Sequence, residues 1–178
     1  MKLMIASDLH GSAYYTRLLL KAMDKEQPDR LLLLGDLLYH GPRNDLPREY
    51  APKQVIELLN ARKSQILCVR GNCEAEVDQM VLEFPVLSEF GVVFADGLTL
   101  YMLHGHKNLD IPVMPGDILL CGHTHVPEVR KDGAHYYVNP GSVSIPKNGS
   151  CHGYMMLENR HLTHVSLEGE NVLPGFTF

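Results

Sequence analysis

The sequence predicts an α/β protein with two packed β-sheets and helices on the outside. The first half of the chain alternates apolar strands with helical segments, and the second half carries hairpin signals. Hydrophobic residues make up 45% of the 178 residues, which is enough to bury a sizeable core. Because no linker or break in composition divides the chain, we expect residues 1–178 to form a single domain.

The first half is predicted to run β-α-β-α-β. The hydroxyl of Ser12 suits an N-cap and Pro52 suits a first helical turn, so each marks the start of a helix. The run RLLLL at 30–34 is continuously apolar, as expected for a strand buried on both faces. The expected elements are strands over 2–7, 30–34 and 65–69, helices over 13–25 and 52–62, and a short helical stretch over 74–82.

Three hairpins are predicted in the second half. Asp96-Gly97 and Asp132-Gly133 favour tight antiparallel connections, because these residue types tolerate positive φ. The paired segments are 91–95 with 98–103, 128–130 with 135–138, and 153–157 with 162–167. The apolar residues Val172, Leu173 and Phe176 near the C-terminus allow two interpretations, a subunit contact in a homo-oligomer or packing in the core.

Composition narrows the classes of partner. A formal net charge of -5 provides no basic surface for a nucleic-acid backbone, so nucleic acid is not expected as a partner. No apolar run approaches the roughly 20 residues that span a bilayer, and the N-terminus turns polar too early for a signal peptide. The four cysteines form no CxxC pair. We therefore expect a cytoplasmic protein with reduced thiols and no membrane contact.

Residues that can bind metals follow five apolar strands. These candidate ligands are Asp8, His10, Asp36, Asn72, His104, His123 and His125. Loops at the carboxyl ends of neighbouring strands in an α/β sheet converge, so these residues can meet in one crevice. Seven ligands are too many for one ion, and a carboxylate can bridge two. Imidazole, carboxylate and amide ligands without thiolate suit divalent manganese, zinc, iron, nickel or cobalt.

Each of these motifs is weak when it is taken alone, because Asp-x-His and Gly-Asp occur often by chance. His123 and His125 form a stronger signal, since side chains two residues apart in an extended segment point the same way. A pair of exposed loop histidines is the competing interpretation. All five motifs follow predicted strands in order along the chain, and this arrangement favours a shared metal site.

The ordered motifs resemble those of the calcineurin-like metallophosphoesterase superfamily. They are Asp8-Leu9-His10, Gly35-Asp36, Gly71-Asn72-Cys73-Glu74, His104-Gly105-His106 and Gly122-His123-Thr124-His125. The resemblance covers residues 2 to about 145 and is closest to the small YfcE-type bacterial phosphodiesterases. These share the chain length, the cysteine after Gly-Asn, the His40-Gly41-Pro42-Arg43 loop and Asn139-Pro140-Gly141-Ser142.

This resemblance implies a four-layer αββα fold, with two mixed sheets sandwiched between helices, and a centre of two divalent ions. Manganese is the expected ion, with zinc, iron, nickel or cobalt as alternatives. The first ion would be bound by Asp8, His10, Asp36 and His125, and the second by Asp36, Asn72, His104 and His123. Asp36 would bridge them. His106 competes with His104 for the fourth motif, but the family pattern favours the histidine directly before Gly105 and leaves His106 a supporting role.

The implied activity is hydrolysis of a small phosphodiester by a metal-bridging hydroxide. Two cations about 3.5–4 Å apart lower the pKa of a shared water toward roughly 7 and clamp the attacking and leaving oxygens. Asn72 and Cys73 are the candidate catalytic residues, and Arg43 is the candidate substrate-binding residue because its fork geometry suits a phosphate. An ordinary exposed loop arginine is the alternative for Arg43.

Cys73 departs from the family pattern, in which many members carry a histidine that protonates the leaving oxygen and an acid at the next position, here Glu74, that orients it. A thiol with a pKa near 8.5 is a poor substitute for imidazolium as a proton donor. We therefore predict a preference for phosphodiesters with acidic leaving groups. A small buried residue without a catalytic part is the alternative for Cys73.

Two other functions compete with this one. A retromer subunit resembles the family and serves mainly as a protein-interaction scaffold, but its ligand set is eroded, whereas His10, Asn72 and His125 are present here. A mononuclear zinc hydrolase could use His104 with the two later histidines. That arrangement leaves the ligands of the first half without a role.

Overall fold

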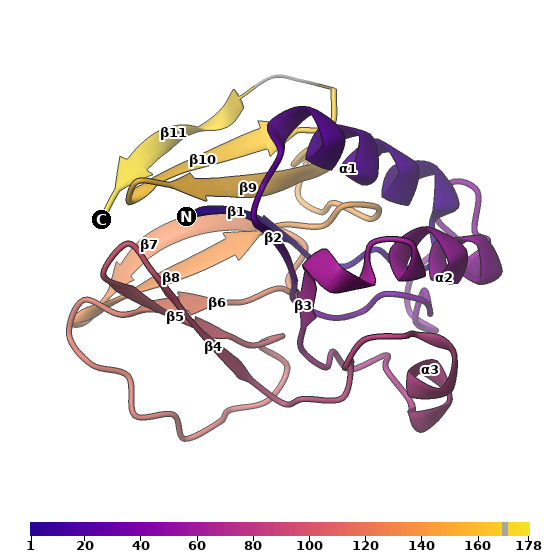
Figure 1. Ribbon diagram of the computed structural model, residues 1–178, viewed down its shortest axis with the longest axis horizontal. Helices are drawn as coiled ribbons and strands as arrows, with labels where there is room; N and C mark the ends of the chain where they lie inside the picture. Colours follow the sequence, from indigo (N-terminus) through magenta and orange to yellow (C-terminus); the bar gives the residue numbers. More distant parts are fainter. Residues whose placement is uncertain (169–170) are drawn as a thin grey trace.

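The protein is a sandwich of two stacked β-sheets with helices against one of them (Figure 1). The structure is a computed structural model and describes residues 1–168 and 171–178. The prediction of an α/β fold with two mixed sheets is confirmed. No described helix is long and apolar enough to cross a membrane.

The first sheet has six strands in the order β11-β10-β9-β1-β2-β3. Their bounds are β1 (Lys2–Ala6), β2 (Arg30–Leu33), β3 (Ile66–Cys68), β9 (Gly153–Glu158), β10 (His161–Ser166) and β11 (Asn171–Thr177). β1, β2 and β3 run parallel, and the other neighbours run antiparallel. The carboxyl ends of the three parallel strands therefore lie at the same edge of the sheet. β11 had not been predicted as a strand.

The second sheet has five strands in the order β4-β5-β6-β8-β7. Their bounds are β4 (Gly91–Ala95), β5 (Leu98–Met102), β6 (Ile118–Leu120), β7 (Pro127–Asp132) and β8 (His135–Pro140). All three predicted hairpins form, as β4–β5, β7–β8 and β9–β10. β5, β6 and β8 are parallel, so the chain after β5 and after β6 leaves the sheet at one end.

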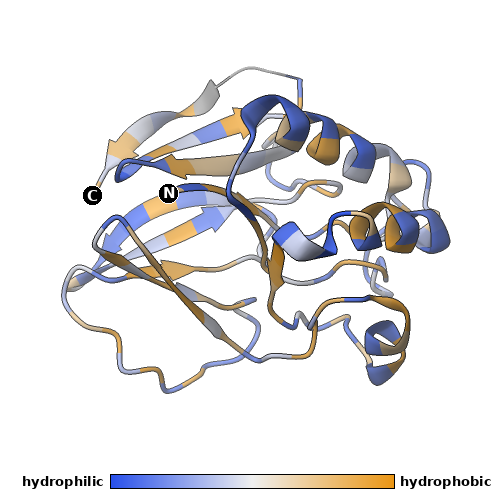
Figure 2. Ribbon diagram, in the orientation of Figure 1, coloured by the Kyte–Doolittle hydropathy of each residue, from blue (hydrophilic) through white to orange (hydrophobic). Residues whose placement is uncertain are grey.

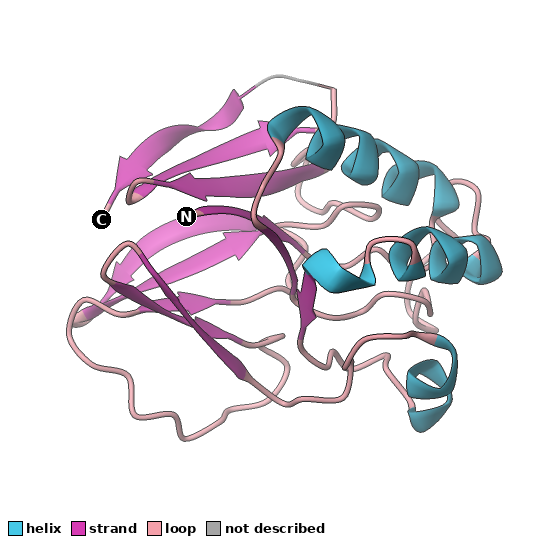
Figure 3. Cartoon of the chain, in the orientation of Figure 1, coloured by secondary structure: helices cyan, strands magenta, loops and turns pink. Residues whose placement is uncertain are grey.

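The two longer helices lie on the outer side of the six-stranded sheet, and the shortest helix lies beyond β3 (Figure 3). They are α1 (Ala13–Glu26), α2 (Pro52–Asn60) and α3 (Glu76–Val81), with a 3-10 turn η1 (Lys63–Gln65) before β3. The two longer helices begin as predicted, because the Ser12 hydroxyl accepts a hydrogen bond from the backbone N–H of Tyr15 and Pro52 occupies the first turn of α2. Among the described residues no helix covers the outer face of the five-stranded sheet, so the expected fourth layer is not formed by them.

The central strand β1 is buried on both faces, which explains its continuous apolar sequence. Met4 and Ala6 face the helices, whereas Leu3 and Ile5 face the second sheet. Full burial of an aliphatic side chain of this size contributes about 1.5–3 kcal/mol to folding. Figure 2 shows hydrophobic and hydrophilic residues alternating along α1, as a helix with one buried side requires.

The C-terminal strand closes one end of the core between the sheets. Leu173 and Phe176 are partly buried and pack against that core, so the core interpretation of these two residues is confirmed. The side chain of Val172 lies outside the described part of the chain.

Candidate metal centre

The loops that follow β1, β2, β3, β5 and β6 meet at one end of the sandwich. Backbone hydrogen bonds join them directly. His10 N–H donates to Asp36 O at 2.9 Å, and Gly122 N–H donates to His104 O at 2.9 Å. The candidate ligands, which span more than a hundred positions of sequence, are therefore held in one place by the backbone.

Five of the seven candidate ligands have a left-handed backbone. Their φ angles are 58° at Asp8, 47° at His10, 56° at Asp36, 67° at His123 and 61° at His125. A non-glycine residue in this region costs about 1–3 kcal/mol and persists only where its surroundings hold it, commonly at functional sites. The conformation lets a short turn aim each side chain back toward the crevice.

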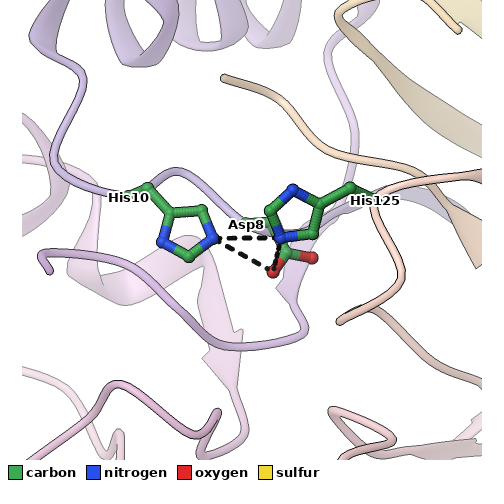
Figure 4. A group of neighbouring side chains, drawn as sticks. All are labelled: Asp8, His10 and His125. Carbon is green, nitrogen blue, oxygen red and sulfur yellow. Dashed lines mark hydrogen bonds and ion pairs between the residues drawn. The ribbon is translucent and has the colours of Figure 1, made fainter. Parts of the chain in front are cut away.

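Asp8, His10 and His125 form one buried cluster (Figure 4). The Nε2 atoms of His10 and His125 lie 3.4 and 3.2 Å from Oδ1 of Asp8 and 3.2 Å from each other. The Nδ1 atom of His10 lies 2.7 Å from the carbonyl oxygen of Tyr39, and that of His125 lies 2.6 Å from Ile145 O. A carbonyl only accepts, so each Nδ1 carries a proton and donates.

This arrangement fits a cation. With Nδ1 protonated, a neutral imidazole presents its Nε2 lone pair to the crevice, and two such lone pairs face Asp8 Oδ1. That oxygen is buried and accepts no hydrogen bond within the described chain. A buried carboxylate oxygen without a donor is costly unless a positive charge faces it. The cluster therefore has the donor set of a divalent-metal site.

Asp36 lies between this cluster and a second one. Its Oδ2 is 3.7 Å from Nε2 of His10 and 3.4 Å from Nε2 of His104. The second cluster is completed by Asn72, whose Oδ1 is 3.1 Å from the same Nε2 of His104. His104 Nδ1 donates to the carbonyl oxygen of Leu34 at 2.6 Å. A carboxylate reached from both sides is positioned to bridge two ions.

His123 and His106 border the second cluster. The ring centroids of His104 and His123 are 5.1 Å apart, and the backbone N–H of His123 donates to Asp8 Oδ2 at 3.0 Å. His106 is further out, with its ring centroid 5.4 Å from that of His104 and 6.1 Å from that of His123. The supporting role of His106 stays a prediction.

The buried carboxylates of the cluster are stabilised by positive charge on the neighbouring groups. Burial opposes ionisation of Asp8, but contacts with His10 and His125 outweigh it and hold the pKa of Asp8 well below its usual range. Burial also lowers the pKa of His104, but Asp36 more than compensates and raises that pKa to about 9. Without metal, a proton on imidazole balances the carboxylates. A divalent ion held by these residues would supply that positive charge instead.

Glu74 joins the loops that follow β2 and β3. Its buried carboxylate accepts hydrogen bonds from the backbone N–H groups of Asp36 at 2.9 Å, Leu37 at 2.7 Å and Gly71 at 2.5 Å. Glu74 was expected to orient residue 73, but these hydrogen bonds go to backbone amides instead. The loops are so close that a Cβ on Gly71 would lie 2.1 Å from Oδ1 of Asp36, which explains the glycine.

A cavity of about 450 Å³ opens onto the ligands. Arg43, predicted as a phosphate contact, is exposed on its wall, and Lys147 also lines it. Sequence reasoning missed Lys147; the motif that ends at Ser142, only five positions earlier, was the available signal. A larger cavity of about 540 Å³ between α1 and α2 contains none of the candidate ligands and is lined mainly by charged surface side chains.

Cys73 lies against the ligands, because its Sγ is grouped with ligand atoms of His10 and Asp36, all within 4.8 Å of one another. The side chain is half-buried and takes a weak hydrogen bond from Asn72 Nδ2 at 3.2 Å. Burial and the neighbouring charge of Asp36 raise the pKa of the Cys73 thiol far above its ordinary value. The thiol therefore lines the cavity beside the ligands and is not a free thiolate.

Comparison with known proteins agrees with this geometry. The model of the calcineurin-like phosphoesterase superfamily domain matches residues 1–161. Phosphodiesterase YfcE of Escherichia coli (strain K12) is 42% identical over 177 residues, which cover 97% of this chain and 96% of that protein. A solved structure of YfcE, a phosphoesterase from E. coli, superposes with a TM-score of 0.94 at 41% identity and 99% coverage of both chains.

A more distant structure shares the fold. A Vps29 variant from Entamoeba histolytica superposes with a TM-score of 0.68 at 20% identity, covering 100% of this chain and 99% of that one. At that identity the likeness concerns the fold alone. The family model, the near-full-length relative and the buried Asp/His cluster together show that the chain belongs to the calcineurin-like phosphoesterase superfamily.

Proposed function

We propose that the chain is a phosphodiesterase that uses two divalent metal ions. The observation that carries this proposal is the convergence of three imidazole Nε2 atoms and two carboxylates, with every Nδ1 already donating to a backbone carbonyl. The first ion is assigned to Asp8, His10, Asp36 and His125, and the second to Asp36, Asn72, His104 and His123. The superfamily membership and the YfcE relative support the same activity.

Two ions held by these residues would supply a nucleophile at neutral pH and would stabilise charge on the phosphoryl oxygens. The chain contributes the geometry. Carbonyl oxygens of Tyr39, Leu34 and Ile145 fix the ring orientations of the three histidines, and Glu74 fixes the backbone of Asp36. The rings of His10, His104 and His125 are therefore held in place before a substrate enters the site.

We propose manganese as the ion, with zinc, iron, nickel or cobalt as alternatives. A donor set of imidazole, carboxylate and amide oxygen without thiolate suits divalent ions of this intermediate softness. All four cysteines are unpaired, which suits a reducing compartment, and we propose the cytoplasm.

The substrate is a small phosphodiester, because a net charge of -5 gives no broad attraction for nucleic acid. Assembly into a homo-oligomer stays a prediction.

Cys73 sets the preference for the leaving group. A thiol beside the ligands donates a proton less well than an imidazolium would, so substrates whose leaving oxygen needs no proton react best. We propose that aryl phosphodiesters react faster than alkyl ones. This role of Cys73 depends on its contact with the substrate, whereas the metal assignment does not.

Hydrolysis of bis(p-nitrophenyl) phosphate tests the activity. The expected result is turnover with added manganese and at least a hundredfold loss in Asp36→Asn, which removes the bridging charge while keeping the shape. Two ions bound per chain are expected by elemental analysis, and a ratio near one would favour a mononuclear zinc hydrolase. Absence of turnover with any divalent ion would support the protein-interaction scaffold instead.

A further inference from the structure

Lys147 lies on the cavity wall in a loop that also orients a metal ligand. Its backbone N–H donates to the carbonyl oxygen of His125 at 3.2 Å, and His125 Nδ1 donates to Ile145 O at 2.6 Å. Ser150 fixes the turn, since its N–H and Oγ donate to Lys147 O at 3.0 and 2.7 Å. The base of the Lys147 side chain is therefore held at a fixed place beside the ligands.

The same loop is anchored at its far end. The His152 ring stacks on Tyr15 with centroids 3.8 Å apart and planes inclined by 11°. His152 Nδ1 donates to the carbonyl oxygen of Val143 at 2.9 Å. The segment that carries Lys147 is thus attached to α1 at one end and to His125 at the other, which limits where the ammonium group can reach.

Arg43 lines the same cavity from a second fixed turn. The side chain of Asn44 donates to His40 O at 2.8 Å, and its backbone N–H donates to Gly41 O at 3.3 Å. Neither Arg43 nor Lys147 forms an ion pair with any residue in the described ranges 1–168 and 171–178. Two cations without counter-charges therefore face the cavity that opens onto the ligands.

The positive charge at the site exceeds what the negative charge of a simple phosphodiester can neutralise. This charge balance rests on the proposed function. Two divalent ions would be balanced by Asp8, Asp36, a hydroxide nucleophile and the single negative charge of the diester, while the buried Glu74 carboxylate is met by three backbone N–H groups. Arg43 and Lys147 then add two positive charges that the scissile group does not neutralise. A substrate with a further anionic group would use them.

We propose that Arg43 and Lys147 bind a second phosphate group of the substrate, separate from the phosphodiester that is cleaved. A guanidinium fork and an ammonium group are the common phosphate-binding side chains. The cavity, at about 450 Å³, is in the size range of sites for ligands as large as a nucleotide. The substrate class is a phosphodiester that carries an additional phosphate.

Binding of two nucleotides that differ by one phosphate tests this proposal. Thymidine 3′,5′-bisphosphate and thymidine 5′-monophosphate are titrated into the manganese-loaded protein by calorimetry. We expect the bisphosphate to bind about tenfold more tightly than the monophosphate. This factor lies at the lower end of what hydrogen bonds to charged groups contribute to affinity, because both cations are exposed. The preference should shrink between 50 and 300 mM salt, since screening weakens an exposed contact.

Lys147→Met is the diagnostic variant, because it keeps the stem of an exposed side chain and the backbone hydrogen bond. It should lose most of the tenfold preference, whereas Lys131→Met, an exposed lysine on β7 outside the cavity, should keep it. Equal binding of both nucleotides by the wild type, or an unchanged preference in Lys147→Met, would overturn the proposal.

Hydrolysis of bis(p-nitrophenyl) phosphate by the same preparations separates this proposal from the proposed function. A protein that hydrolyses the diester but binds both nucleotides equally refutes only the second phosphate site. A protein that prefers the bisphosphate through Lys147 but hydrolyses nothing refutes only the activity.

Discussion

Replacement of Glu74 by alanine should destabilise the metal-free protein. The Glu74 carboxylate is buried and accepts hydrogen bonds from three backbone N–H groups, those of Asp36, Leu37 and Gly71. Each buried donor left without an acceptor costs about 1–3 kcal/mol, and water entering the space recovers part of that. Removal of Glu74 also relieves the burial and the repulsion from Asp36 that raise its pKa to about 7, so the expected loss is about 3 kcal/mol, the low end for three donors, or about 6–12 °C in Tm for a chain of this length.

Urea unfolding in the presence of a chelator measures this loss without the contribution of bound metal. Glu74→Gln keeps one acceptor oxygen and should lose about half as much. Glu76→Ala removes an exposed carboxylate in the first turn of α3 and should change the free energy of unfolding by less than about 1 kcal/mol. If Glu74→Ala is no more destabilised than Glu76→Ala, the three amides find other acceptors and the reasoning is refuted.

Three further predictions concern the metal centre. Gly71→Ala should abolish binding of at least one ion, because its Cβ would lie 2.1 Å from Oδ1 of Asp36; two ions per chain in elemental analysis would contradict this. Cys73→His should raise the rate on alkyl phosphodiesters at least tenfold by supplying a proton donor, and unchanged rates on a methyl ester would rule that role out. Manganese should bind more tightly as the pH rises from 6 toward 9, because the ion displaces a proton from His104, whose pKa is raised to about 9. Calorimetry in buffers of different ionisation enthalpy should show the release of this proton. An affinity for manganese that does not depend on pH would argue against the displacement.

Much of the fold could be predicted from the sequence, because helix starts and tight turns depend on residues that are close together in the chain. The hydroxyl of Ser12 and the ring of Pro52 act within one helical turn, so both helix starts were predicted correctly. The Asp-Gly turns specify their hairpins for the same reason. β11 was missed, because its pairing with β10 depends on a register that shifts twice along the ladder rather than on a clear alternation of residues.

The short helix α3 was predicted to begin at Glu74, two residues before its observed start at Glu76. The difference has a tertiary cause. Glu74 is drawn inward by amides of the loops after β2 and β3, and Asp78 then caps α3 through the backbone N–H of Ala75 at 2.8 Å. A polar residue that serves a distant loop cannot be distinguished from a helical one by periodicity.

The sequence by itself determined the chemistry of the site, since the residue types and their places after apolar strands predict a nitrogen and oxygen metal centre. Only the tertiary structure decided how those residues are used. It directs the Nε2 atoms of three histidines inward through the carbonyl oxygens of Leu34, Tyr39 and Ile145, which lie 20 to 70 positions away from the histidines they orient. It also brings Lys147 to the same cavity. Such contacts form between segments remote in sequence, so no local pattern of residues encodes them.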